Sequence, residues 1–223
     1  MTLPLALLVA ILVGAVTACV TGPVLGALPE PALAEGEVKV RYRDLPRHPL
    51  ALGAGVWAAA LTLATVGSLP PTAWAPYVVL AVVGSVGCII DAATTWLPSR
   101  ILHVGWVVVP LCLAGATALG GGGDGWAALV RALVGAVVVG GLMLVAHLVA
   151  SFGFSDVRLG LLTGAVGAWV SWQTLVGGLL LGSVVGAAWG LAHAWRAGRT
   201  PFAYGPSLLF GPYLAVLVAA VTR

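Results

Sequence analysis

The sequence predicts an all-α protein, a polytopic bundle of helices embedded in a membrane. The chain has 223 residues, of which 61% are hydrophobic and only 8% are charged. A water-soluble domain carries about 25% charged residues, so this composition cannot supply a water-facing surface. The mean hydropathy is +1.09. The 31 glycines suit closely packed membrane helices, in which small residues let two backbones approach.

The apolar residues are collected in eight runs that are long enough, or nearly so, to cross a bilayer. A membrane-spanning helix needs about 20 predominantly apolar residues. The sixth run is short, and it is closely joined to the seventh. We expect about eight transmembrane helices, with bounds that are accurate to a few residues. The expected helices cover residues 3–27, 50–68, 73–90, 101–119, 127–150, 157–171, 174–195 and 205–222.

The first apolar run could also be a cleaved signal peptide, because the small residues at 31–34 that follow it have the pattern of a cleavage site. No Lys or Arg precedes the run, and it is longer than a typical signal-peptide core. We therefore interpret it as a retained helix. Residues 1–49 then form a first helix with a short cytoplasmic loop, and residues 50–223 form the main membrane-embedded domain.

The basic residues predict the orientation of the bundle, because Lys and Arg accumulate on the cytoplasmic side of a membrane. With the N-terminus outside, four connections face the cytoplasm and, together with Arg158 just beyond one of them, hold eight of the ten basic residues. Only Arg131 and Arg223 fall on the other side. The four connections are residues 28–49, 91–100, 151–157 and 196–204, and their basic residues are Lys39, Arg41, Arg43, Arg47, Arg100, Arg196 and Arg199.

Two aspartates are the strongest functional signal in this nearly uncharged chain. Asp91 ends the third run and Asp156 follows the fifth, so both are expected at the cytoplasmic face. A carboxylate at the edge of a hydrocarbon layer is costly to place and indicates function. If the two converge, one stays protonated while the other acts as a base. Such a pair can hold a water molecule and hydrolyse a peptide bond by acid–base chemistry.

Three segments together resemble the type IV prepilin peptidase family, membrane aspartyl proteases of the GxGD type. In the first, Asp91 is followed by Leu97-Pro98-Ser99-Arg100; the second reads Gly153-Phe154-Ser155-Asp156-Val157-Arg158-Leu159. Ser155 stands where the family motif has its second glycine. The third, with Gly205-Pro206 after Pro201-Phe202, is similar to the family's PFGP segment with an insertion. The resemblance extends from about residue 73 to the end of the chain.

The resemblance implies a peptidase that cuts the leader of type IV prepilin-like or Tad/Flp-type substrates after a glycine, at the cytoplasmic face of the plasma membrane. The substrate would carry an N-terminal hydrophobic helix. The loop region that the family uses for N-methylation is reduced here and has no cysteine, so we do not expect methyl transfer. Asp91 and Asp156 would be catalytic, and the residues expected to bind substrate or shape the site are Pro98, Ser99, Arg100, Gly153, Ser155, Arg158, Gly205 and Pro206.

Two other functions are compatible with the same aspartates: a proton-coupled transporter that uses them as a relay, and a non-catalytic membrane scaffold. The sequence contains no phosphate-binding glycine loop, and its basic residues are too dispersed to indicate a nucleic-acid partner. The three cysteines form no CxxC pair. We assign no metal and no cofactor, and the sequence leaves the oligomeric state open.

Overall fold

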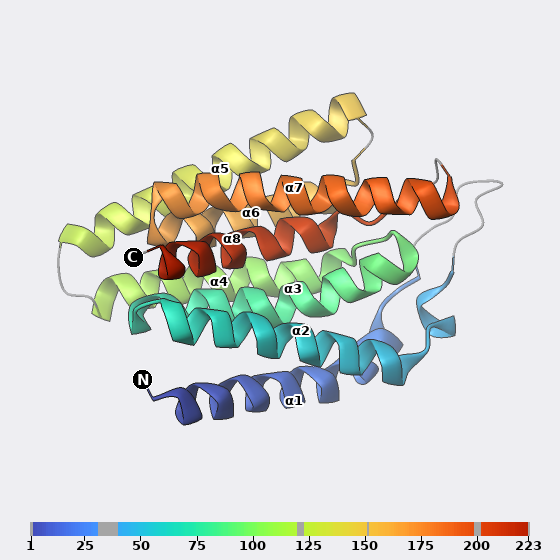
Figure 1. The fold of residues 1–223 in the computed structure, drawn as a ribbon, viewed down its shortest axis with the longest axis horizontal. Coiled ribbons are helices and arrows are strands. Elements are labelled where there is room, and N and C mark those ends of the chain that lie inside the picture. Colours follow the sequence, from blue (N-terminus) through green and yellow to red (C-terminus); the bar gives the residue numbers. More distant parts are fainter. Residues whose placement is uncertain (1, 31–39, 120–122, 151, 199–201, 223) are drawn as a thin grey trace.

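The computed structural model describes residues 2–30, 40–119, 123–150, 152–198 and 202–222. Over these residues the chain is all-helical, with eight α-helices, two single 3₁₀ turns and no strand (Figure 1). The elements are α1 (Leu3–Ala27), η1 (Tyr42–Asp44), α2 (Arg47–Ser68), η2 (Pro71–Ala73), α3 (Trp74–Thr94), α4 (Ser99–Leu119), α5 (Gly123–Ala150), α6 (Phe154–Val170), α7 (Trp172–Ala197) and α8 (Gly205–Val221).

Six of these helices are long and apolar enough to cross a membrane: α1, α2, α3 with the turn before it, α4, α5 and α7. The helices α6 and α8 have 17 residues each and are shorter than this measure requires. The prediction of a helical membrane bundle is therefore confirmed. That all eight helices span the bilayer, with the N-terminus outside, stays a prediction.

Successive helices run in opposite directions, so the chain returns repeatedly to the same two ends of the bundle (Figure 1). The most enclosed of the six long helices is α3, because 67% of its most apolar stretch is buried, against 22% in α1, α5 and α7. It contacts α1, α2, α4, α6 and α8. This central helix carries Asp91, and its end lies at the same end of the bundle as the start of α6, which carries Asp156.

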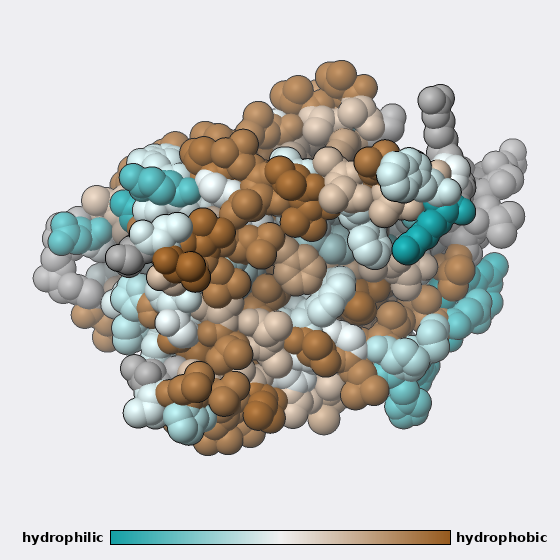
Figure 2. Space-filling model, in the orientation of Figure 1, coloured by the Kyte–Doolittle hydropathy of each residue, from teal (hydrophilic) through white to brown (hydrophobic). Residues whose placement is uncertain are grey.

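The outward-facing side chains of the long helices are apolar, as a lipid-facing surface requires. Figure 2 shows hydrophobic residues over much of one face, with hydrophilic residues gathered mainly toward the ends of the bundle. Large apolar side chains such as Ile11 on α1, Val137 on α5 and Leu180 on α7 are more than half exposed. In water this surface would drive aggregation, so the bundle is suited to a bilayer.

Glycines set the spacing of the α5–α6 pair, which is the most extensive helix contact in the bundle. A Cβ atom added to Gly135 would lie 2.6 Å from the carbonyl oxygen of Gly164 and would also overlap the Cβ of Ala168. Both obstacles belong to the facing helix, so they cannot rotate away as a flexible side chain would. The two backbones can approach this closely only because residue 135 has no side chain.

We expect Gly135→Ala to destabilise the protein by about 1–3 kcal/mol, because the added methyl group forces α5 and α6 apart. The measurement is thermal or denaturant unfolding of the purified protein in detergent. Gly141→Ala is the matched control: Gly141 lies on the same helix, and a Cβ there would meet nothing within 4 Å. Equal stability of the two variants would contradict this account of the contact.

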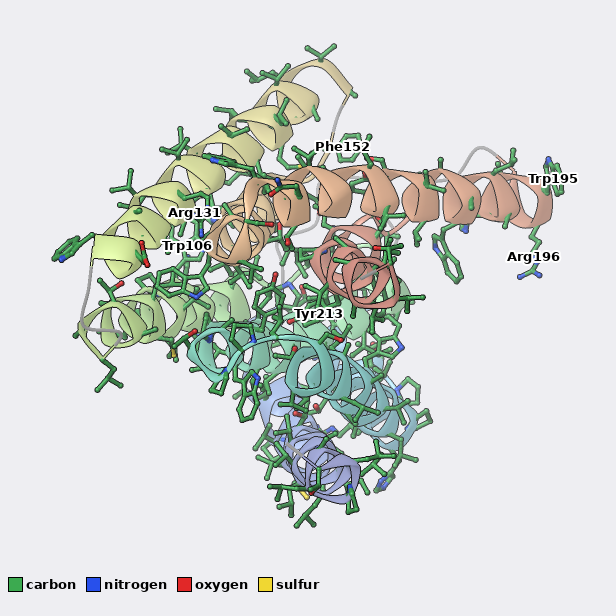
Figure 3. All side chains as sticks on the ribbon, turned by 60° about the vertical axis from the view of Figure 1, so that its left-hand side comes forward. Trp106, Arg131, Phe152, Trp195, Arg196 and Tyr213 are labelled. Atoms are coloured by element: carbon green, nitrogen blue, oxygen red, sulfur yellow. The ribbon has the colours of Figure 1, made fainter. Side chains whose placement is uncertain are left out.

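Arg131 is one of the two basic residues that the predicted topology places on the external side, and its hydrogen bonds explain why it lies there. It lies on α5 (Figure 3), and its guanidinium donates hydrogen bonds to the carbonyl oxygens of the last residues of α6: Ala168 at 2.5 Å, Trp169 at 2.6 Å and Val170 at 3.2 Å. The final carbonyls of a helix have no partner within the helix, and they carry partial negative charge. Arg131 thus caps α6 from a neighbouring helix.

Arg131→Met is expected to lower the stability by about 2 kcal/mol, because it leaves these carbonyls without a charged donor. Arg131→Lys retains the charge but not the forked donor geometry, so it should fall between the wild type and Arg131→Met. Unfolding midpoints of the three proteins in the same detergent test the order. A methionine variant as stable as the wild type would show that the cap contributes nothing.

Candidate active site

The two predicted aspartates line one cavity of about 710 Å³ at the end of the bundle where α3 ends and α6 begins. Its walls come from four parts of the chain that are distant in sequence: the segment after α1 with the η1 turn, residues 95–100 from the end of α3 to the first turn of α4, the α5–α6 connection, and the segment before α8. All four were predicted to face the cytoplasm. The cavity is therefore formed by tertiary packing, with each aspartate supplied by a different helix.

Asp91 lies in the last turn of α3 and is only 4% exposed. Its Oδ2 atom accepts a hydrogen bond from the backbone N–H of Gly205, at 3.1 Å, at the first residue of α8. A Cβ atom on residue 205 would lie 2.7 Å from that same oxygen. The start of α8 can approach the carboxyl group this closely only because residue 205 is a glycine, and this contact fixes one oxygen of Asp91.

Asp156 lies in the first turn of α6 and is 9% exposed. Its Oδ2 atom accepts a hydrogen bond from the backbone N–H of Gly153 at 3.1 Å, while its own backbone N–H donates to the Gly153 carbonyl at 2.9 Å. This reciprocal turn holds the carboxyl group at the helix N-terminus, where the partial positive charge of the helix favours an anion. His147, on the preceding helix, bonds through Nδ1 to the carbonyl of Phe152 and so ties down the same connection.

The two carboxyl groups are near enough for the charge of Asp156 to act on Asp91. Each has one oxygen bound to a backbone amide, which leaves the other oxygen free to bind water or a substrate group. Two carboxyl groups that interact strongly titrate as a pair rather than as separate residues. The arrangement can supply one acid and one base at the same place.

The structure places most of the other predicted site residues at this cavity. Pro98, Ser99, Arg100, Gly153 and Ser155 line it. Gly205 contacts Asp91 directly, as described above. Pro206 follows in the first turn of α8 and does not contribute to the lining, although its ring suits a helix start.

Arg158 lies apart from this group. Its guanidinium carbon is 5.1 Å from the centre of the Phe154 ring, and its backbone carbonyl accepts a hydrogen bond from the indole of Trp106 at 3.2 Å. Residues two positions apart on a helix do not face each other, so Arg158 is not expected to pair with Asp156. Its placement favours packing against the aromatic ring over contact with the cavity.

Ser155 is accommodated without backbone strain. It lies in the first turn of α6, and Thr95 is the only non-glycine residue with a positive φ among those the structure describes. A serine in place of the motif glycine therefore requires no left-handed conformation. The departure from the family pattern costs nothing in backbone geometry, and it places a hydroxyl-bearing residue in the cavity wall.

Several residues of the cavity were not expected from the sequence. Thr95 ends α3 with φ 59° and ψ 22°, a left-handed conformation that costs an L-residue about 1–2 kcal/mol. This sharp reversal brings Trp96 to Pro98 back over the cavity. Phe152 and Tyr204 form an edge-to-face ring pair with centroids 4.9 Å apart. Tyr42 and Glu30 also line the cavity, from the segments on either side of the undescribed residues 31–39.

The fold and the cavity define a class of protein: a helical membrane bundle that presents two carboxyl groups in a cavity at one end. Two curated proteins match part of the chain, the prepilin leader peptidase/N-methyltransferases of Burkholderia pseudomallei strains 1026b and K96243. Each is 43% identical to this chain over 68 residues. The matched segment covers 30% of this chain but only 20% of each relative. No family model matches the chain, and no solved structure matches it.

Proposed function

We propose that this protein is a membrane aspartyl endopeptidase that removes the leader from type IV prepilin-like or Tad/Flp-type substrates. The observation that carries the proposal is the pair of buried aspartates, Asp91 and Asp156, each held by a backbone amide in one cavity of the bundle. The partial similarity to prepilin leader peptidases supports the choice of substrate class. The N-methyltransferase activity in the relatives' name is not part of the proposal.

Hydrolysis by such a pair begins with one ionised and one protonated carboxyl group. The carboxylate takes a proton from a bound water as the water oxygen bonds to the peptide carbonyl carbon, and the protonated partner gives its proton to the carbonyl oxygen. The resulting tetrahedral diol collapses when the amide nitrogen takes the proton held by the first aspartate. The C–N bond then breaks, and a hydroxyl proton returns to the second aspartate, which restores the starting state.

The proposed topology has eight membrane crossings, an external N-terminus and a cavity that opens to the cytoplasm of the cell. The distribution of charge supports it, because Arg41 and Arg43 lie in a connection at the cavity end, and Arg47 and Arg100 lie in the first turns of the helices that begin there. Figure 3 shows Arg196 near the C-terminal end of α7, together with Trp195, an aromatic residue of the kind found at membrane interfaces. A plasma-membrane location follows from the substrate class.

The position of the aspartates favours hydrolysis over transport. A carrier places its ionisable residues near the middle of the bilayer, often between two repeated halves. Asp91 lies in the last turn of its helix and Asp156 in the first turn of its own. Both are held in fixed positions by backbone donors, which suits a reaction centre that must hold a water molecule in place.

The test is cleavage of a synthetic prepilin peptide that contains its leader and its hydrophobic segment, by the purified protein in lipid nanodiscs. Mass spectrometry of the products would give the position of the cut. We expect one cut at the leader junction by the wild type and none by the double variant Asp91→Asn/Asp156→Asn. A folded wild type that cuts none of several pilin-type peptides, or a double variant that still cuts, would overturn the proposal.

A further inference from the structure

The segment that follows α1 reaches into the cavity and presents a buried tyrosine there. Tyr42 begins the η1 turn, is 5% exposed and lines the same cavity as Asp91 and Asp156. It also packs with Leu25 and Ile90 in a cluster between α1, α2 and α3. The described residues on either side of 31–39 are therefore part of the cavity wall.

Glu30 holds this turn in place. Its two carboxylate oxygens accept hydrogen bonds from the backbone N–H groups of Tyr42 and Arg43, each at 2.9 Å. Carboxylate bonds to backbone amides are stronger than neutral ones. Glu30 is 12 residues before Tyr42, so this contact joins the segment after α1 to the η1 turn and helps to fix the position of Tyr42.

Among the described residues, the phenol group of Tyr42 has only a weak hydrogen-bond partner. Its hydroxyl donates to the carbonyl oxygen of Trp96 at 3.4 Å, which is beyond the usual range for O–H···O hydrogen bonds. Burial, the Glu30 charge and the Asp91 charge raise the pKa of Tyr42 to about 12. The hydroxyl thus keeps its proton at every physiological pH, and it is available to a better acceptor in the cavity.

We infer that Tyr42 is a substrate-contacting residue of the reaction, whose hydroxyl donates a hydrogen bond to the oxygen of the peptide carbonyl as the tetrahedral diol forms. This inference rests on the proposed function. The carbonyl oxygen gains negative charge as water adds, and a fixed donor at that position stabilises the transition state more than the substrate. Tyr42 transfers no proton: the two aspartates carry out the proton transfers described above, and the tyrosine O–H bond stays intact throughout.

The test compares Tyr42→Phe with the wild type in the nanodisc cleavage assay, with kcat and KM determined separately. Phenylalanine retains the ring that packs against Leu25 and Ile90, so the fold should be kept. We expect kcat to fall about 10- to 100-fold with little change in KM, because the lost interaction exists only in the transition state. If Tyr42 had a purely structural role in the cavity wall, Tyr42→Phe would raise KM or lower the melting temperature instead.

Tyr77→Phe is the matched control. Tyr77 is fully buried on α3, its hydroxyl has no hydrogen-bond partner among the described residues, and it lies 14 residues before Asp91, about 21 Å along the helix. The control should cleave at the wild-type rate. If Tyr42→Phe does not fold, Glu30→Gln provides a second variant, because it loosens the turn from an exposed position and should also lower kcat.

Each outcome has a defined meaning. A Tyr42→Phe variant with the wild-type kcat, or one in which only KM changes, overturns the inference and leaves the peptidase proposal intact. If only Glu30→Gln can be tested, an unchanged kcat overturns the inference in the same way. A wild type that cleaves no substrate removes the proposed function and the role of Tyr42 together.

Discussion

Replacement of either Asp91 or Asp156 by asparagine is expected to lower kcat for leader cleavage by at least about 10³-fold, because one proton-transfer partner is lost in each case. Asparagine has nearly the same shape and still accepts the backbone hydrogen bond from Gly205 or Gly153. The fold should therefore be preserved. The measurement is the initial rate of product formation in nanodiscs, with circular dichroism to verify the helical content.

The double variant should be no slower than the single variants, because residues that act as one unit are strongly non-additive. Asp124→Asn is the matched control for the same chemical change. Asp124 is an exposed residue in the first turn of α5 and does not line the cavity, so its variant should have the wild-type rate. If one of the two single variants retained full activity, the two-carboxyl mechanism would be wrong even though cleavage itself was observed.

Gly205→Ala is expected to reduce kcat by at least about 100-fold although it changes no ionisable group, because a small misplacement of a reacting group has this effect. The added Cβ would lie 2.7 Å from Oδ2 of Asp91 and 3.4 Å from Sγ of Cys88. Asp91 is buried and short, so its carboxyl group can move away only by giving up the hydrogen bond to the Gly205 amide. Two quantities are measured for the variant and the wild type in the same detergent: kcat and the unfolding midpoint.

Gly115→Ala is the control for this substitution, since Gly115 lies within α4 and a Cβ there would meet nothing within 4 Å. It should retain both the rate and the stability of the wild type. A Gly205→Ala variant with normal kcat would show that the contact between α8 and Asp91 does not position the carboxyl group. If Gly205→Ala lowered the unfolding midpoint as strongly as it lowered kcat, the glycine would have a role in packing alone.

The sequence predicts the helices well because each one is a long apolar run, and it predicts their ends less well. The third predicted run ends at residue 90, but α3 continues to Thr94; the sixth predicted run begins at residue 157, but α6 begins at Phe154. Both aspartates therefore lie inside helical turns rather than beside them. Polar residues can be included in a terminal turn when their side chains find partners outside it, as Asp91 does at Gly205 and Asp156 at Gly153.

The cavity could be predicted only in part. Asp91, Asp156 and their flanking motifs are recognisable because charges are rare in this chain. Tyr42, Glu30 and Tyr204 are not, since their place in the cavity depends on how the connections fold back over the end of the bundle. Local patterns carry no information about such long-range contacts, and the bond between Gly205 and Asp91 joins residues 114 positions apart.

The short helix α8 begins close to the carboxyl pair and helps to set its position along the bundle. The helices α5 and α7 have 28 and 26 residues, whereas α6 and α8, which carry Asp156 and Gly205, have 17 each. In Figure 1, α7 extends past the start of α8. Because Asp91 is bonded to the first residue of α8, its carboxyl group lies below a rim formed by the end of α7.

This recess changes what a membrane-anchored substrate must do to be cut. Pulling one further turn of an apolar helix out of lipid would expose about four side chains, at a cost of about 1.5–3 kcal/mol for each large one. A reaction centre below the rim reduces the distance over which the substrate must be withdrawn. On the proposed function, the hydrophobic helix of a pilin subunit can stay inserted in the bilayer while its leader is removed. The subunit then leaves the enzyme by lateral diffusion.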